Sequence, residues 1–291
     1  MKKNEFWFIT TEHLEDKLLF RDSADFVVAM NYVATLVHRL GVSMVSFVLM
    51  SNHMHFVIWC DWNLAGKFIN SFKMIYSRYL TRKYGFHEHL RNVGVDIRAI
   101  NLDDEGLETV IAYVQTNPVA ANICAFPSDY PWGSGSCFFC PQEKAGGIRL
   151  SGLSARERYR IMHSKCDLPS NWVLKAEGYI DPMCYVQKDL VERTFRTPKR
   201  MNFFLRNSSK AKKRIECQEN GAPAFRDQLV YAAIPELCWS LFQKKSIDDL
   251  DERQTIELFK QVRFRFASNV DQIARVSGRP YEVVAAYLDS V

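Results

Sequence analysis

The first 120 residues alternate between short runs of mostly apolar residues and segments in which apolar residues recur at every third or fourth position. The first pattern is typical of strands and the second of amphipathic helices, and the turn-compatible pair Ser51-Asn52 separates two of the strands. The last helix should end before Asn117, because the residue that precedes a proline is disfavoured in the helical region. Strands are therefore predicted over residues 5–11, 42–50, 54–59 and 93–100, and helices over residues 23–40, 64–84 and 104–116.

The order of these elements, βαββαβα, predicts the fold class of the first domain, residues 1–140. This order is typical of an α+β, ferredoxin-like sandwich with an antiparallel sheet, here with one further helix at its end. A connecting region follows over residues 141–215, and its segment 196–214 is strongly basic. We interpret that segment as a basic tether, either a solvated linker or a contact for a polyanion.

The remaining residues, 216–291, are predicted to be all-α. Two segments, 227–243 and 251–266, have helical apolar spacing. Residues 270–288 resemble a helix-turn-helix, in which Gly278 would form the turn. Because helix pairs of this kind also occur in plain bundles, DNA binding and simple packing both stay open for this region.

Two histidines, His53 and His55, lie within an apolar run and are separated by one residue, Met54. In a strand, alternate side chains point to the same face, so both imidazoles should point to one spot. Two neutral imidazoles held in this way can form half of a metal site. The alternative is a pair of ordinary polar residues on an exposed strand.

A tyrosine and an asparagine four residues apart, Tyr113 and Asn117, should share one face at the end of the third helix. The phenol could act as a nucleophile, and the amide oxygen could be a third metal ligand. Each residue also has an ordinary explanation, because a helical tyrosine often packs its ring in the core and an asparagine often ends a helix.

The combination of His53, His55, Tyr113 and Asn117 resembles the single-tyrosine HUH transposases. The tract from Tyr113 to Ala121, followed by Asp129-Tyr130-Pro131-Trp132, is similar to the branch called REP-associated tyrosine transposases. The resemblance covers residues 5–139, about half of the chain.

The resemblance implies that Tyr113 is the catalytic nucleophile and that His53, His55 and Asn117 bind Mg²⁺ or Mn²⁺. The enzyme would cleave and rejoin single-stranded or hairpin DNA through a 5′-phosphotyrosine intermediate. Because a phenol has a pKa near 10, its attack at neutral pH needs a cation's field or a base. The DNA sequence or hairpin that the chain would recognise stays open, and so does the choice between a monomer and a homodimer.

Basic residues supply further candidates for DNA contact, because cations that track phosphates beside rings that stack on bases suit a single strand. For the candidates on the helix of residues 64–84, the alternative is an amphipathic helix whose lysines simply face water. The candidates on the helix of residues 64–84 are Lys67, Lys73, Arg78, Arg82 and Lys83, and those in the tether are Lys210, Lys212, Lys213 and Arg214.

Composition restricts the class of protein. The net charge is +5, and 47% hydrophobic with 24% charged residues is ordinary for a soluble globular chain. Because the sequence contains no apolar run of about 18 residues and no signal peptide pattern, we expect a cytoplasmic protein that does not enter a membrane. The eight cysteines are then expected to be free thiols. A structural zinc site would need two ligand pairs, Cys137 with Cys140 and His163 with Cys166.

Two other functions remain open at this point. A metal-dependent nuclease could use the same histidines with water as the nucleophile, although Tyr113 argues against it. A catalytically silent DNA-binding regulator could rely on the basic tether and the C-terminal helices.

Overall fold

A four-stranded antiparallel sheet lies at the centre of the first part of the molecule. The computed structural model describes residues 3–11, 18–85, 90, 93–121, 123–140, 146–164, 166–208, 225–266 and 268–289. The sheet has the order β2-β3-β1-β4, so β1 and β3 are its central strands. Its strands are β1 (Glu5–Thr11), β2 (Ser43–Met50), β3 (His53–Cys60) and β4 (Val95–Ala99).

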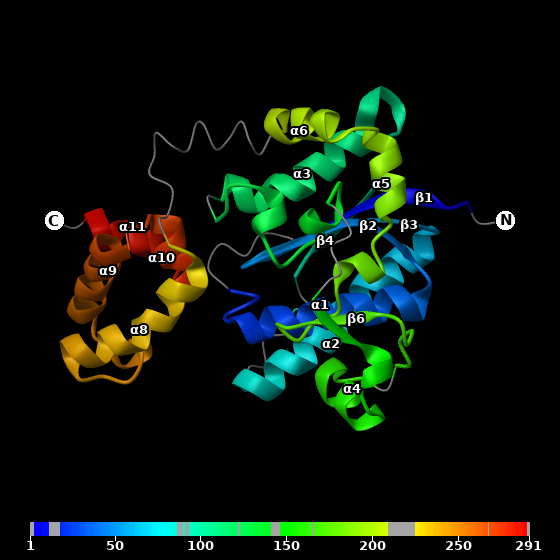
Figure 1. Ribbon diagram of the computed structural model, residues 1–291. Helices are drawn as coiled ribbons and strands as arrows, with labels where there is room; N and C mark the ends of the chain where they lie inside the picture. Colours follow the sequence, from blue (N-terminus) through cyan, green and yellow to red (C-terminus); the bar gives the residue numbers. More distant parts are fainter. Residues whose placement is uncertain are drawn as a thin grey trace.

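Different helices cover the two faces of this sheet (Figure 1). Phe56 of β3 packs against Phe68 and Phe72, so the even-numbered side chains of β3 face α2. The odd-numbered His55 instead contacts Tyr113 of α3 on the opposite face. The three helices are α1 (Ser23–Leu40), α2 (Trp62–Tyr84) and α3 (Gly106–Ala120).

The prediction that the third helix ends at residue 116 is wrong, because α3 continues through Pro118 to Ala120. Proline has no N–H to donate to the carbonyl four residues earlier, which here belongs to Val114. The side chain of Asn117 replaces that donor: its Nδ2 donates to the carbonyl oxygens of Val114 at 3.2 Å and Tyr113 at 2.8 Å. The helix therefore passes the proline without leaving these carbonyls unsatisfied.

The region after residue 140 folds onto the first domain. Asn31 of α1 donates to the carbonyl oxygen of Gly178 at 3.0 Å and accepts from the N–H of Ile180 at 3.0 Å. Side chains from residue 150 to residue 204 belong to the same hydrophobic core as the sheet. The elements are β5 (Gly147–Arg149), β6 (Val173–Lys175), α4 (Ala155–Met162), α5 (Lys188–Phe195) and α6 (Pro198–Asn207).

The first half of the predicted basic tether is helical. Thr197 caps α6, and Met201 and Phe204 are buried. Arg200 forms ion pairs with Glu105 at 2.7 Å and with Glu108 at 3.1 Å, next to the start of α3. Residues 198–207 are therefore not a solvated linker, because apolar residues at helical spacing are buried and Arg200 pairs with residues at the start of α3. The rest of the tether, with Lys210, Lys212, Lys213 and Arg214, lies outside the described residues.

The C-terminal helices have a core of their own, formed mainly by residues from Val230 to Leu288. As predicted, Gly278 adopts a left-handed conformation, with φ of 68°, between the last two helices. None of the helices in the described residues is long and apolar enough to cross a membrane. The helices are α8 (Asp227–Phe242), α9 (Glu252–Phe266), α10 (Val270–Ser277) and α11 (Tyr281–Asp289).

Short 3₁₀ helices connect several of these elements. They are η2 (Asp103–Glu105), η3 (Pro127–Asp129), η4 (Gly135–Cys137), η5 (Leu150–Gly152), η6 (Pro182–Cys184) and η7 (Ile247–Asp249). The segment after η3 also closes the outer edge of the sheet. Leu49 of β2 donates its N–H to the carbonyl of Trp132 at 2.8 Å and accepts from the hydroxyl of Tyr130 at 2.7 Å.

A buried carboxylate joins the C-terminal helices to the turn between β2 and β3. Asp227 accepts from Ser51 Oγ at 2.7 Å, from Gln272 Nε2 at 3.0 Å and from the guanidinium of Arg275 at 3.0 Å. Burial alone would raise the pKa of Asp227, but Arg275 and these hydrogen bonds outweigh it and lower the pKa below its ordinary value. Asp227 is therefore charged at neutral pH and holds the junction together.

Replacing Asp227 with alanine is expected to destabilise the protein by about 3–5 kcal/mol at pH 7, because the partly buried Arg275 loses its counter-ion. The folded pKa lies below the unfolded value, so this contribution is present at neutral pH and is lost as the pH falls below about 4. Urea unfolding at pH 7 and at pH 3 would measure it. The difference between variant and parent should shrink at pH 3, and an equal difference at both values would contradict the assignment.

Candidate active site

The predicted pair of histidines lies on the sheet face that carries α3. His53 is 6% exposed and His55 is 1% exposed, and their ring centroids are 4.8 Å apart. Met54 between them is fully buried on the other face. The alternation of side chains along the strand therefore places both imidazoles together, as the sequence predicted. The alternative, a pair of polar residues on an exposed strand, is wrong, because both side chains are buried.

Helix α3 brings Tyr113 and Asn117 to the same histidines. Two residues of a strand span about 6.7 Å and four residues of a helix span about 6 Å, so the two pairs can lie side by side. The Tyr113 ring lies 5.5 Å from that of His55, and Asn117 Oδ1 lies 3.4 Å from His53 Nε2. All four side chains predicted for the site are thus brought together.

Hydrogen bonds orient both side chains that meet where His53 Nε2 faces Asn117 Oδ1. His53 Nδ1 lies 2.8 Å from Asn52 Oδ1, which can only accept, so this ring nitrogen carries the proton. In the neutral imidazole, the lone pair of Nε2 then points at Asn117 Oδ1. That oxygen is aimed in turn by the donation of Asn117 Nδ2 to the backbone of α3.

Two acceptor atoms that face each other repel unless a proton or a cation lies between them. Ligands about 2.1 Å from a small divalent cation, at right angles to each other, are about 3.0 Å apart, close to the observed separation of 3.4 Å. Imidazole nitrogen with amide oxygen is also a donor set that Mn²⁺ and Mg²⁺ accept. The residues therefore fit a divalent cation held by His53, His55 and Asn117.

The phenol of Tyr113 is half-buried. Its ring packs edge-on to Phe8, with centroids 5.9 Å apart, and to His55. Burial raises the pKa of Tyr113, and the positive charge of Arg98 on β4 partly opposes this shift. Tyr113 is therefore protonated at neutral pH in the free protein and needs help to become a nucleophile.

The predicted DNA contacts on α2 are not part of this site. Because α2 covers the face of the sheet opposite to Tyr113, its cations point away from the histidines. Lys73 is buried, and its Nζ donates to the carbonyl of Val93 at 2.5 Å. Lys83 forms ion pairs with Asp22 at 2.6 Å and Asp25 at 2.8 Å. The exposed cations of the predicted set are Lys67, Arg78 and Arg82, together with the paired Lys83.

The four candidate zinc ligands do not form a metal site. Cys137 is buried in η4, whereas the ring of His163 lies 6.4 Å from that of Tyr79. Cys140 and Cys166 are partly exposed free cysteines. Within the described ranges, no three histidine, cysteine, aspartate or glutamate side chains gather in a way that could hold a metal.

Several residues around the histidines have no part in the site predicted from the sequence. The sequence pattern assigns Asn52 only to the turn, although its position next to His53 is a signal for a contact with that ring. Arg98 alternates with Asp96 on the strand opposite Phe8, and strand period could have placed it on the Tyr113 face. The local sequence around Arg226 does not indicate that it lies near the site, because the fold brings it to His53 from a distant part of the chain.

Comparisons with known proteins give a partial likeness to solved structures. No protein-family model matches the chain, and no curated protein matches it. A solved structure described as a REP-associated tyrosine transposase bound to a REP hairpin is similar to part of it, with 15% sequence identity and a TM-score of 0.34. The match covers 46% of this chain and 78% of the other chain. A likeness this distant does not indicate an activity for this chain.

Proposed function

We propose that the protein is a single-tyrosine DNA transposase that cleaves and rejoins single-stranded DNA. The observation that carries the proposal is the meeting of Tyr113 with His55, and of Asn117 with His53, on one face of the sheet. The phenol of Tyr113 thus lies next to a site whose residues fit a cation. The sheet order β2-β3-β1-β4 supports a ferredoxin-like sandwich, which is the fold that the resemblance to HUH transposases implies.

The proposed reaction exchanges one phosphoester for another. The phenolic oxygen of Tyr113 attacks the phosphorus of a phosphodiester, and a new Tyr113 O–P bond forms. The bond from phosphorus to the 3′ oxygen breaks, and this oxygen leaves as a 3′-hydroxyl after accepting a proton. The phenol proton passes to a neighbouring base or to water. Because no bond energy is lost to hydrolysis, a later 3′-hydroxyl can reverse the step and join two strands.

The residues around the phosphate have separate tasks in this proposal. His53, His55 and Asn117 would hold a divalent cation, and the chemistry that this ion supplies is charge neutralisation at a nonbridging phosphate oxygen. Asn52 keeps His53 in the tautomer that binds metal. Phe8 and His55 hold the ring of Tyr113 in place. Because burial raises the pKa of Tyr113, the phenol is protonated before the reaction, and its proton has to be removed during the attack.

A denaturing gel of the protein with labelled single-stranded hairpin DNA and Mg²⁺ or Mn²⁺ tests the proposal. We expect a covalent protein–DNA adduct that survives denaturation and disappears after protease digestion. Free cleaved DNA without an adduct would instead indicate a nuclease that uses water. Binding without cleavage would indicate a regulator.

A further inference from the structure

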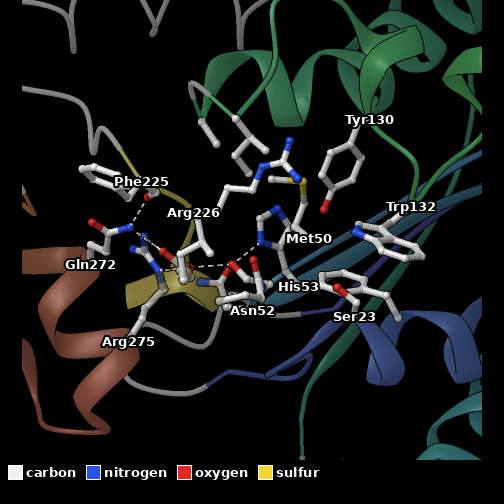
Figure 2. A pocket seen from close by; sticks show the side chains of 17 residues that line it. Ser23, Met50, Asn52, His53, Tyr130, Trp132, Phe225, Arg226, Gln272 and Arg275 are labelled. Carbon is white, nitrogen blue, oxygen red and sulfur yellow. Dashed lines mark hydrogen bonds and ion pairs between the residues drawn. The ribbon is translucent and has the colours of Figure 1, made fainter. Parts of the chain in front are cut away.

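A cavity of about 410 Å³ opens next to His53, between the first domain and the C-terminal helices. Its volume is within the range of small-ligand sites. One side of the cavity comes from the β2–β3 turn, a second from the segment after α3, and a third from α8 and α10 (Figure 2). Its lining includes Asn52, His53, Tyr130, Trp132, Phe225 and Arg226.

The start of α8 is fixed against the first domain by several contacts. The carboxylate of Asp227 accepts from Ser51, two residues before His53. Gln228 Nε2 donates to the carbonyl of Phe20 at 3.1 Å, and Arg21 donates to the hydroxyl of Tyr231 at 3.4 Å. Arg226 immediately precedes these residues, so its backbone position relative to His53 is set by the fold.

The side chain of Arg226 reaches across the cavity. Figure 2 shows its guanidinium between the ring of His53 and Tyr130. Its charge also opposes the increase that burial causes in the pKa of Tyr130. Of the three charged residues that line the cavity, Arg275 and Asp227 neutralise each other, which leaves the single positive charge of Arg226.

The walls of the cavity combine this cation with aromatic rings. Trp132 stacks on Phe26, with centroids 4.9 Å apart, and Phe225 is 42% exposed at the opposite side. A guanidinium binds phosphate through charge-assisted hydrogen bonds, and rings stack on bases. The arrangement thus matches a nucleotide better than a simple carboxylate or a neutral metabolite.

We propose that this cavity binds one nucleotide of the DNA strand, with its phosphate on the guanidinium of Arg226, next to the site of His53. The C-terminal helices then contribute a positioning residue to the active site instead of forming a separate binding module. The inference rests on the proposed function, because it takes single-stranded DNA as the ligand. It goes beyond that function by assigning a phosphate contact to the last third of the chain.

Binding of DNA by a protein that cannot cleave it tests this inference. In the full-length Tyr113→Phe background, the affinity for a short fluorescein-labelled single strand would be measured by fluorescence anisotropy over a range of salt concentrations. We expect Arg226→Ala to weaken binding by about 10-fold to 100-fold and to flatten the slope of log affinity against log salt by about 0.7. Arg226→Lys keeps the charge but not the planar set of donors of the guanidinium. Its affinity for the strand should therefore lie between that of the parent and that of Arg226→Ala.

A matched control is Arg263→Ala, which removes another exposed arginine, from α9. Thermal unfolding of both variants would show that each still folds. If Arg226→Ala binds as tightly as Arg263→Ala, or if the parent does not bind the strand, the inference is overturned. If the wild-type protein forms no covalent adduct but Arg226→Ala still weakens binding, the nucleotide site stands and the covalent mechanism fails.

Discussion

Tyr113→Phe is expected to abolish the covalent adduct, with a loss of cleavage of on the order of a thousandfold or more, and to leave DNA binding nearly unchanged. The substitution removes only the attacking oxygen. Because the ring packs against Phe8 and His55 through its faces and edges, the remaining side chain should keep its position. Denaturing gels would measure the adduct, and fluorescence anisotropy would measure binding.

A second tyrosine serves as the control. Tyr159 on α4 is 52% exposed and lies outside the site, so Tyr159→Phe should form the adduct at the parental rate. Adduct formation by Tyr113→Phe at that same rate would exclude Tyr113 as the nucleophile. The proposed transposase activity would then lose its central residue.

His53→Ala and His55→Ala should each lower DNA cleavage by more than about a hundredfold, and excess EDTA should do the same to the parent protein. Loss of an outer-shell partner of a metal typically costs about 10-fold to 100-fold, so loss of a ligand should cost more and Asn52→Ala should cost less. Calorimetry in the Tyr113→Phe background would measure the affinity for Mn²⁺. This affinity should fall more in His53→Ala and His55→Ala than in Asn52→Ala.

His163→Ala is the matched control for the loss of an imidazole, because His163 is exposed on the surface away from the site. It should cleave DNA and bind Mn²⁺ like the parent. Full cleavage by the parent protein in excess EDTA would refute the metal site. Equal losses for Asn52→Ala and His53→Ala would argue that Asn52 does more than orient the ring.

The central part of the site could be predicted because its spacings are local. A strand repeats every two residues and a helix every 3.6, so His53 with His55 and Tyr113 with Asn117 are paired by the sequence itself. The sheet that joins the two pairs follows from apolar runs long enough to be recognised as strands. Predicted and observed boundaries differ by at most two residues for all four strands.

Features that depend on distant parts of the chain could not be predicted in this way. Asn31 anchors residues 178 and 180, and Arg200 pairs with Glu105, across separations that no local period reveals. Lys73 has the spacing of an exposed cation but is buried under the segment that carries Val93. The continuation of α3 was missed for a related reason, because a side chain supplied the bond that Pro118 could not.

The proline in α3 also determines how much freedom the proposed ligand Asn117 has. Its amide cannot turn over without withdrawing a donor from Val114, whose carbonyl Pro118 leaves without its usual partner. The rotational entropy of this side chain is therefore already lost when the chain folds, and a cation that arrives later does not have to remove it. Aspartate at this position would offer an oxygen but no donor. A charged ligand would thus be looser here than the neutral one that the chain carries.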